Sequence, residues 1–431
     1  MDSIELKKAI NDIGFAKALK ENLSISEKKI PEQTKRYSEA VDRFTEIYGD
    51  GDLSVFSVGG RSEISGNHTD HNHGKVIAAC INLDILAIAK KSMTGTVRIK
   101  SEGFPEDIVY AGAVEKPDPN KYYKSESIIA GMEKAFLNAG YRIGGFDAYT
   151  TSNVLKGSGL SSSAAFEVMV GNILNHLYNN GEVSNVEIAK MAQYAENTYF
   201  GKPCGLMDQT ACAVGGFITI DFLNPSSPVI EKLDFDLSKY GYDLCIVNTG
   251  GNHADLNEDY ASVPAEMKKA AAYMGKSVLR EASKDEFLKL LRTRSAIREE
   301  LGDRAILRAM HFYDENERVA KQVAALKSGN FEEFKKGVTA SGNSSYKYLQ
   351  NVYTVKNVNE QGLSMALYLT EDFLKGTDGV CRIHGGGFAG TIQAFVPSEL
   401  TDKYSDMIES VFGKGSCYVL NVRKSGACRI I

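Results

Sequence analysis

The chain has 431 residues, of which 43% are apolar and 24% charged, and its formal net charge is −5 at pH 7. This length and composition are typical of a globular protein with two or three domains. The negative net charge argues against electrostatic capture of nucleic acid or of an anionic membrane surface, although a small anion can still bind through local N–H groups.

The sequence contains no pattern that predicts export or membrane insertion. Its start, MDSIELKKAI, lacks the basic and apolar regions of a secretory signal. The most apolar run, 76–89, is interrupted by Asn82 and Asp84 and is too short to cross a bilayer. Seven scattered cysteines, odd in number and without a CxxC pair, favour free thiols in a reducing compartment. We therefore expect a cytoplasmic protein.

Residues 1–48 are predicted to form peripheral helices, because Tyr37, Val41, Phe44 and Tyr48 recur on one helical face. Farther along the chain, segments rich in Val and Ile predict strands, and helical spacing of apolar residues predicts helices. The expected strands are 53–58, 76–91, 97–100, 217–222, 244–248, 380–383, 392–396 and 416–421, and the clearest expected helices are 127–139, 188–200, 304–326 and 358–374.

A polar, His-rich stretch, GGRSEISGNHTDHNHGK, follows the first expected strand and is predicted to be a loop. Its side chains His68, Asp70, His71 and His73 are of the types that bind Zn²⁺, although their spacing matches no standard zinc signature. The same imidazoles and carboxylate can bind the hydroxyl groups of a sugar or polyol, since they offer both donors and acceptors. A solvated polar loop is the third interpretation.

The segment 155–165, LKGSGLSSSAA, places glycines and serines directly before a helical pattern. Free N–H groups and the positive end of the helix dipole favour an anion there, and the glycines allow phosphate oxygens to approach closely. The serine hydroxyls can bind phosphate or complete a Mg²⁺ shell. A plain turn with serine N-caps is the alternative, and no Lys follows the glycines as in a Walker loop.

Two acidic residues and two turn-forming segments in the rest of the chain are also candidates for a role. Glu196 lies on an expected helix, and Asp208 follows a Pro/Gly turn at a helix start, where an Asp is often only a cap or a favourable terminal charge. The segment 224–228, NPSSP, is a candidate linker between domains. A second glycine-rich loop, 382–391, lies between two expected strands. Together these elements predict an α+β protein with two lobes and a crevice between them.

Three ordered motifs resemble those of the galactokinases, within the GHMP superfamily of small-molecule kinases. GRSEISGNHTDHNHG resembles the galactokinase signature, GSGLSSSAA the superfamily phosphate loop and GGGFAG the late glycine motif. CGLMDQ resembles the segment that carries the catalytic Asp, and NTGGNHADLNEDY the stretch that leads to a sugar-contacting Tyr. The resemblance covers about 40–425.

The resemblance implies a fold with an N-terminal lobe, 49–228, that contains a left-handed βαβ element like that of ribosomal protein S5. It also implies a ferredoxin-like C-terminal lobe, 229–431, and an active site in the crevice; 1–48 would be a helical extension. The implied reaction is ATP-dependent phosphorylation of D-galactose at its C1 hydroxyl to α-D-galactose 1-phosphate. The implied cofactors are ATP and Mg²⁺, and we expect a monomer or a weak homo-oligomer.

The same resemblance implies a role for each matching residue. Asp208 would be the catalytic base facing the C1 hydroxyl, with Arg61 beside it and beside the transferring phosphoryl group. The implied sugar contacts are Asn67, His68, Asp70, Gly205 and Tyr260. The implied nucleotide contacts are Ser101, Gly157, Ser158, Gly159, Leu160, Ser161, Ser162 and Ser163, and the implied Mg²⁺ ligands are Ser163 and Glu196. Gly385–Gly387 would support the phosphate loop and close the site.

The chain also departs from the family pattern. Asn67 replaces a Glu associated with the 6-hydroxyl end of the sugar, and a neutral amide would tolerate a C6 carboxylate better than Glu would. His71 replaces a Tyr, His384 a Thr, and Ala389-Gly390 a GlyGly pair, and the chain contains no Trp near the adenine or elsewhere.

Four functions follow as hypotheses, in this order. The first is a galactokinase, and the second an anomeric kinase for a related sugar such as galacturonate or N-acetylgalactosamine. The third is a non-catalytic sensor of galactose and ATP, which the retained Ser163, Ala164 and Ala165 disfavour. The fourth is a zinc hydrolase centred on His68.

Overall fold

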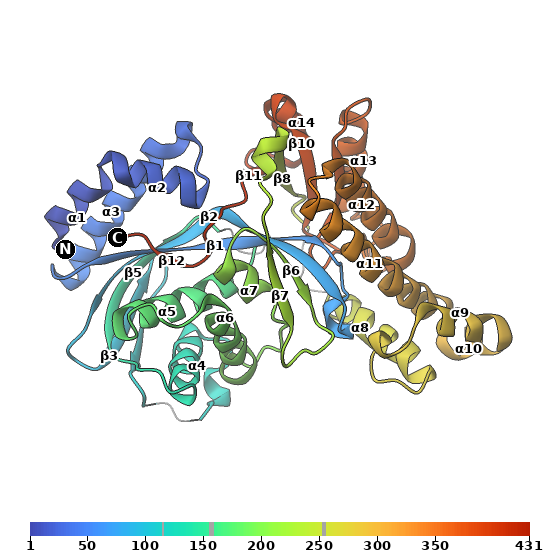
Figure 1. The fold of residues 1–431 in the computed structure, drawn as a ribbon, viewed down its shortest axis with the longest axis horizontal. Helices are drawn as coiled ribbons and strands as arrows, with labels where there is room; N and C mark the ends of the chain where they lie inside the picture. Colours follow the sequence, from blue (N-terminus) through green and yellow to red (C-terminus); the bar gives the residue numbers. More distant parts are fainter. Residues whose placement is uncertain (114–115, 155–158, 252–255) are drawn as a thin grey trace.

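Two β-sheets, each covered by helices, form the core of the protein in the computed structural model, which describes residues 1–113, 116–154, 159–251 and 256–431 (Figure 1). The larger sheet has the strand order β12-β1-β2-β5-β3-β4, and β6 pairs with β2 and β7 with β6. All its pairings are antiparallel except β3 with β5. Its strands are β1 (Ser54–Ser65), β2 (Lys75–Lys91), β3 (Thr96–Ser101), β4 (Glu106–Tyr110), β5 (Phe146–Ser152), β6 (Phe217–Asp221), β7 (Val229–Leu233) and β12 (Cys428–Arg429).

The smaller sheet is antiparallel, with the strand order β11-β8-β10-β9. Its strands are β8 (Tyr242–Asn248), β9 (Val380–His384), β10 (Thr391–Pro397) and β11 (Cys417–Leu420). The predicted strands are therefore confirmed in both sheets. The segment NPSSP, however, is the turn between β6 and β7, which pair through Asp221 and Val229, so it joins two strands of one sheet rather than two lobes.

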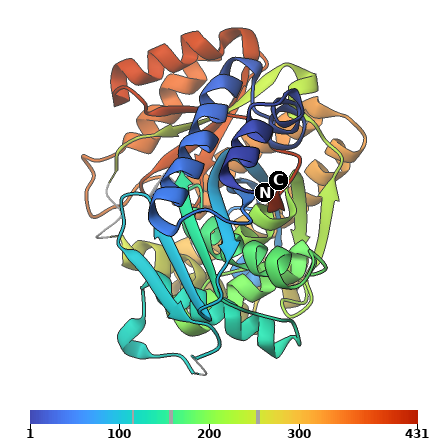
Figure 2. The ribbon, with the colours of Figure 1, turned by 90° about the vertical axis from the view of Figure 1, so that its left-hand side faces the viewer.

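Helices cover both faces of the larger sheet and the outer side of the smaller one (Figures 1 and 2). Those before the smaller sheet are α1 (Ser3–Ile10), α2 (Ile13–Leu23), α3 (Ile30–Tyr48), α4 (Ser125–Asn138), α5 (Ser162–Tyr178), α6 (Asn185–Tyr194) and α7 (Met207–Val214). Those after it begins are α8 (Asn257–Tyr273), α9 (Lys284–Thr293), α10 (Ile297–Leu301), α11 (Asp303–Lys327), α12 (Phe331–Ser344), α13 (Gly362–Phe373) and α14 (Thr401–Phe412). A π-helix, Ala195–Phe200, continues α6.

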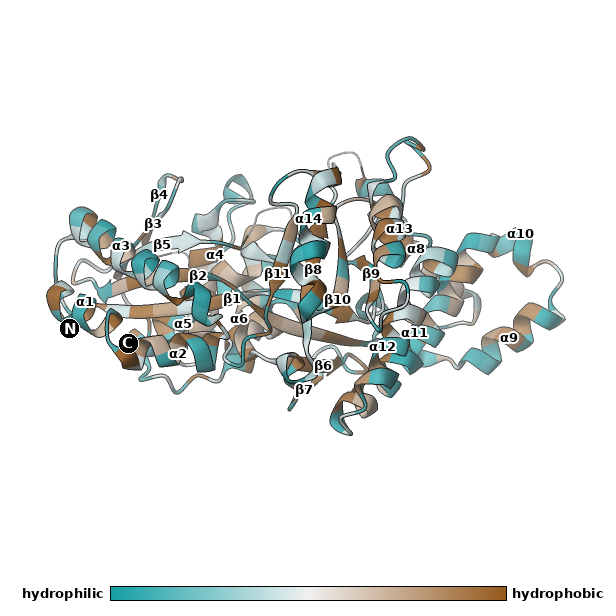
Figure 3. Cartoon of the chain, turned by 90° about the horizontal axis from the view of Figure 1, so that it is seen from above, coloured by the Kyte–Doolittle hydropathy of each residue, from teal (hydrophilic) through white to brown (hydrophobic). Residues whose placement is uncertain are grey.

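Side-chain alternation explains why β1 and β2 are apolar along most of their length. Successive residues of a strand point to opposite faces, so a strand that is covered on both faces needs apolar residues at nearly every position. Val55 and Ile88 pack with α1–α3, while Phe56 and Ala87 pack with α4–α7. Colouring by hydropathy shows brown stretches along the central strands, while the surrounding helices carry both teal and brown residues (Figure 3).

The predicted N-terminal helices are confirmed, and they bury Tyr37, Val41 and Phe44 against the larger sheet. The first predicted strand, in contrast, was placed too short. β1 continues to Ser65, so Arg61 lies on a strand and not in a loop. Gly60 lets this strand pass close to Leu160, because a Cβ atom at position 60 would lie only 2.6 Å from the carbonyl oxygen of Leu160. Among the described residues, no helix is both long and apolar enough to cross a membrane.

Asp84, which interrupts the apolar pattern of β2, holds the N-terminal helices on the sheet. Its carboxylate accepts a hydrogen bond from Arg36 Nη1 at 2.6 Å and lies 4.0 Å from the fully buried Arg423. Burial by itself raises the pKa of Asp84, but the two guanidinium groups outweigh it and hold the pKa below the ordinary 3.8. The carboxylate is thus ionised and paired inside the protein.

We expect Asp84→Asn to lower the free energy of unfolding by about 3 to 5 kcal/mol, because two arginines lose their buried counter-charge. The wild-type contribution is fully present above 3.8, the ordinary pKa, and is lost as the pH falls through the lower folded-state value. Denaturant unfolding at neutral and acidic pH measures both effects. Asp42→Asn, which breaks the exposed pair with Lys7, is the control; an equal loss in both variants would contradict the prediction.

Candidate active site

Arg61 and Asp208 form a bidentate ion pair where β1 meets the start of α7. Arg61 Nε lies 2.7 Å from Asp208 Oδ1, and Arg61 Nη2 lies 2.7 Å from Oδ2. The guanidinium is buried, whereas the Asp208 side chain keeps 34% of its surface exposed. The carboxylate is therefore accessible to a ligand while its partner is enclosed, and this pairing of the two residues is what the sequence predicts.

The electrostatics keep Asp208 ionised. Burial raises its pKa, but the Arg61 guanidinium and the Ser161 hydroxyl lower it by more, so that the pKa lies below the ordinary 3.8. Asp208 also lies in the first turn of α7, where the helix dipole favours a negative charge. A carboxylate in this environment is a weak base at neutral pH, but it is well placed to orient a hydroxyl group.

The phosphate loop is bound to this ion pair through its last residues. Arg61 N donates to Leu160 O at 3.0 Å, and Arg61 Nη1 donates to Gly159 O. Ser161, at a left-handed φ of 59°, donates its hydroxyl to Asp208 Oδ2 at 2.5 Å. Ser161 is the N-cap residue of α5 but makes no side-chain capping bond. The plain serine-cap interpretation is thus wrong for Ser161.

The other predicted nucleotide contacts lie around the start of α5 and the end of β3. Ser162 and Ser163 open α5, and Ser163 is exposed. Leu160 is fully buried, and its carbonyl oxygen accepts the hydrogen bond from Arg61 N. Ser101 ends β3 and accepts a hydrogen bond from Thr150 Oγ1 at 2.9 Å. Gly157 and Ser158 lie outside the described residues.

Glu196 and Glu167 form a buried pair of carboxylates. The sequence predicts a role for Glu196 but not for Glu167. Glu196 Oε1 pairs with Lys202 at 2.9 Å, and its Oε2 accepts from Gln209 Nε2 at 2.8 Å. The same Gln209 nitrogen donates to Glu167 at 3.0 Å, and burial together with the Glu196 charge raises the pKa of Glu167 to about 8. Glu167 follows Ser163 by four residues on α5, a spacing that could have suggested it.

A cavity of about 300 Å³ collects most of the predicted sugar contacts. His68, Asp70 and Tyr260 line it, together with His71, one of the imidazoles expected to suit a sugar or polyol, and Glu63, which the sequence did not single out. Gly205 is adjacent, since a Cβ atom there would lie 2.8 Å from Asp70 Oδ2. The stretch predicted to carry sugar-binding groups therefore does converge on one cavity.

The late glycine loop closes this cavity. Tyr260 donates its hydroxyl to Gly387 O at 2.7 Å, and His68 Nε2 lies 2.8 Å from Gly386 O. At Gly387, with φ of 84°, a Cβ atom would lie 2.0 Å from Asn351 O, so only glycine fits. The loop predicted to support the phosphate loop thus contacts the cavity through His68 and Tyr260.

Asn67, the residue at which the signature departs from its family, is fully buried. Its Nδ2 donates to Gly385 O at 2.7 Å and to Glu63 Oε1 at 3.0 Å. Its Oδ1 accepts from Asn351 Nδ2 at 2.8 Å and from Ser345 Oγ at 3.3 Å. Each hydrogen-bonding position of the amide is therefore used within the protein, and a bond from Asn67 to a sugar would have to replace one of these.

The described histidines do not gather into a metal centre. In the part of the chain that the structure describes, no three His, Cys, Asp or Glu side chains are grouped so as to hold a metal ion. His71 Nδ1 lies 2.9 Å from Asn72 Nδ2, and burial lowers the pKa of His71 to about 3. The zinc interpretation therefore finds no support in the described geometry.

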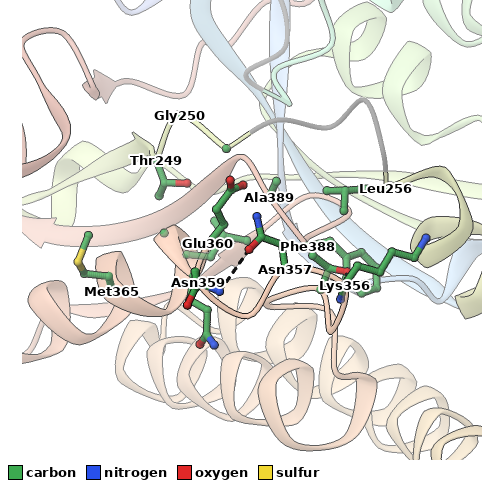
Figure 4. Close-up of a pocket in the computed structure, with 15 residues that line it drawn as sticks. Thr249, Gly250, Leu256, Lys356, Asn357, Asn359, Glu360, Met365, Phe388 and Ala389 are labelled. Atoms are coloured by element: carbon green, nitrogen blue, oxygen red, sulfur yellow. Dashed lines mark hydrogen bonds between the residues drawn. The ribbon is translucent and has the colours of Figure 1, made fainter.

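A larger cavity, of about 690 Å³, is lined in part by Phe388 and Ala389 of the late glycine loop (Figure 4). Thr249, Lys356, Asn357 and Phe388 are among the residues around it, and Lys356 pairs with Glu258 at 2.7 Å. None of the predicted catalytic, sugar, nucleotide and metal contacts that the structure describes lines this cavity. The larger of these two cavities is therefore not the one that the predicted site residues line.

Two family models match the sequence. One, described as the galactokinase galactose-binding signature, matches 42–91, and the other, the GHMP kinases N terminal domain, matches 127–216. Both matched segments carry residues of the site, the first from β1 to β2 and the second from α4 to the start of β6.

Curated relatives and solved structures match over most of the chain. A galactokinase from Clostridium tetani is 30% identical, in an alignment that covers 88% of this chain and 92% of that protein. A galactokinase from Streptomyces coelicolor is also 30% identical, and the alignment covers 86% of this chain and 92% of that protein. The structure of Lactococcus lactis galactokinase complexed with galactose superposes with a TM-score of 0.74 at 27% identity, covering 90% of this chain and 98% of that one. The Methanococcus jannaschii mevalonate kinase, at 14% identity and a TM-score of 0.61, shares the fold.

Proposed function

The chain belongs to the galactokinase family of GHMP kinases, and on that basis we propose which of its residues transfer the terminal phosphoryl group of ATP to the C1 hydroxyl of D-galactose. The observation that carries the assignment is the Arg61–Asp208 pair, joined to the end of the phosphate loop by Ser161. In this arrangement the Asp208 carboxylate, the Arg61 guanidinium and the end of the phosphate loop are in direct contact.

In the proposed reaction the C1 oxygen of the sugar forms a bond to the terminal phosphorus of ATP, while the bond from that phosphorus to the ADP oxygen breaks. Asp208 accepts a hydrogen bond from the C1 hydroxyl and takes its proton late, because its pKa is too low for early deprotonation. Arg61 holds the carboxylate in place and contributes positive charge beside the transferring group. Most of the rate enhancement then comes from positioning and charge neutralisation.

The residues near the start of α5 are suited to a Mg²⁺ ion. Mg²⁺ prefers carboxylate and hydroxyl oxygens and usually keeps several waters. Ser163 offers an exposed hydroxyl and Glu196 a buried carboxylate, while Glu167 Oε1 is buried without a hydrogen-bond partner in the described part of the chain. We propose Ser163 and Glu196 as ligands; the bound ion would neutralise the phosphate oxygens. Lys202 would release Glu196 Oε1 when the ion binds.

His68, Asp70 and Tyr260 are proposed to bind the sugar, with Gly205 leaving room beside Asp70. Galacturonate and N-acetylgalactosamine are the alternative acceptors, since Asn67 stands in place of a Glu in the signature. A non-catalytic sensor is less compatible with the site, because Ser163, Glu196 and the Arg61–Asp208 pair are all present.

We expect purified protein with MgATP to release ADP fastest with galactose, compared by kcat/KM with galacturonate, N-acetylgalactosamine and glucose. The cavity offers hydrogen-bonding groups suited to a neutral sugar, which is the physical reason for this expectation. Preference for a C2- or C6-modified sugar would keep the mechanism and change the substrate. ATP binding without turnover of any sugar would support the sensor instead.

A further inference from the structure

Glu63 lies on the same face of β1 as Arg61, two residues farther along the strand. The pairing with β2 is regular here, with Arg61 opposite Cys80 and Glu63 opposite Ala78. Alternate residues of a strand share a face and are separated by ~7 Å, a distance comparable to the width of one sugar ring. A sugar whose C1 hydroxyl lies at Asp208 would therefore extend toward Glu63.

Among the described residues, one of the two oxygens of the Glu63 carboxylate is hydrogen-bonded and the other is not. Oε1 accepts from Asn67 Nδ2 at 3.0 Å and lies 3.5 Å from Arg382 Nη2. No hydrogen bond to Oε2 is present among the described residues. The side chain keeps 9% of its surface exposed, and it lines the 300 Å³ cavity together with His68 and Asp70.

Asn67 cannot provide the recognition group at this end of the cavity without breaking its own contacts. Its amide is fully buried and satisfied by four protein groups. The two residues instead act together: Asn67 binds Oε1 of Glu63, and Oε2 keeps its hydrogen-bonding capacity in a residue that lines the cavity. The fully buried Arg382 lies 3.5 Å from the same oxygen, Oε1, that Asn67 binds.

We propose that Glu63 is a specificity-determining residue, which accepts a hydrogen bond from a hydroxyl at the end of the sugar remote from C1 and excludes sugars that carry a carboxylate there. This deepens the proposed function and rests on it. A carboxylate that accepts a hydroxyl hydrogen bond favours a neutral hexose, and the like charge of a hexuronic acid is repelled. The substitution at Asn67 then does not open the site to galacturonate.

The test is Glu63→Gln, which keeps the shape and an acceptor for Asn67 but removes the charge. We expect kcat/KM for galactose to fall about tenfold and the preference for galactose over galacturonate to fall by at least about tenfold, since one charged hydrogen bond and one repulsion are lost. Glu63→Asp keeps the charge on a shorter side chain, so it should lower kcat/KM for galactose but still exclude galacturonate. Titration of each sugar into the ADP-bound protein measures the same preference without turnover.

Glu133→Gln is the matched control, because Glu133 is a buried carboxylate on α4 that does not line the cavity. It should leave the preference between the two sugars unchanged. An unchanged preference in Glu63→Gln, or admission of galacturonate by Glu63→Asp, would overturn the inference. Failure of the wild type to phosphorylate any sugar would count against the proposed function, while the binding titrations would still decide the role of Glu63.

Discussion

Asp208→Asn is expected to lower kcat about 10²- to 10⁴-fold, the range that a positioned acid–base group contributes. The amide keeps the size of the carboxylate but cannot take the proton of the C1 hydroxyl. It also disrupts the bidentate contact with Arg61, in which both oxygens accept hydrogen bonds at 2.7 Å. Single-turnover phosphorylation of galactose measures the loss.

Nucleotide binding should survive the same substitution. Without the carboxylate the end of the phosphate loop becomes more positive, because Arg61 keeps its charge. ADP affinity should therefore be retained or increased, which separates a catalytic effect from misfolding. Asp221→Asn is the control, since Asp221 also pairs with an arginine, Arg280 at 3.1 Å, but lies at the end of β6 outside the cavity. A fully active Asp208→Asn enzyme would refute the assignment of the catalytic base.

Arg61→Lys is expected to lower kcat/KM about a hundredfold, because an ammonium cannot reproduce the planar fork that holds both oxygens of Asp208 and Gly159 O. Arg98→Lys, at the partly exposed pair with Asp147, should have little effect on activity. If the two lysine variants behaved alike, the guanidinium of Arg61 would have no special role.

Arg61 also sets the pH dependence of kcat/KM. Arg61 holds the pKa of Asp208 below its ordinary value against the effect of burial, so the active carboxylate is lost only when the pH falls through that low value. In Arg61→Met the burial remains and the counter-charge is gone, so the pKa of Asp208 rises. The acidic limb of the kcat/KM profile should then move to higher pH. An unshifted limb would show that another group titrates there.

Much of the site could be predicted because its groups are carried by short motifs with local physical meaning. Glycines before a helix start indicate an anion site, and Asp208 after a Pro/Gly turn indicates a charge at a helix N-terminus. The α+β class and most strands followed from periodicity, since strand and helix patterns depend on neighbouring residues. The end of β1 was missed because Gly59 and Gly60 look like a turn.

The motifs, their order and the family that they indicate can all be taken from the sequence. Three features of the site depend instead on the folded chain: Ser161 binds Asp208 rather than capping α5, Asn67 makes four internal hydrogen bonds, and Glu63 lines the cavity. The reason is distance along the chain. Arg61 and Asp208 are 147 residues apart, and Asn67 and Asn351 are 284 apart. Contacts of this kind depend on how whole sheets and helices pack, which no local pattern specifies.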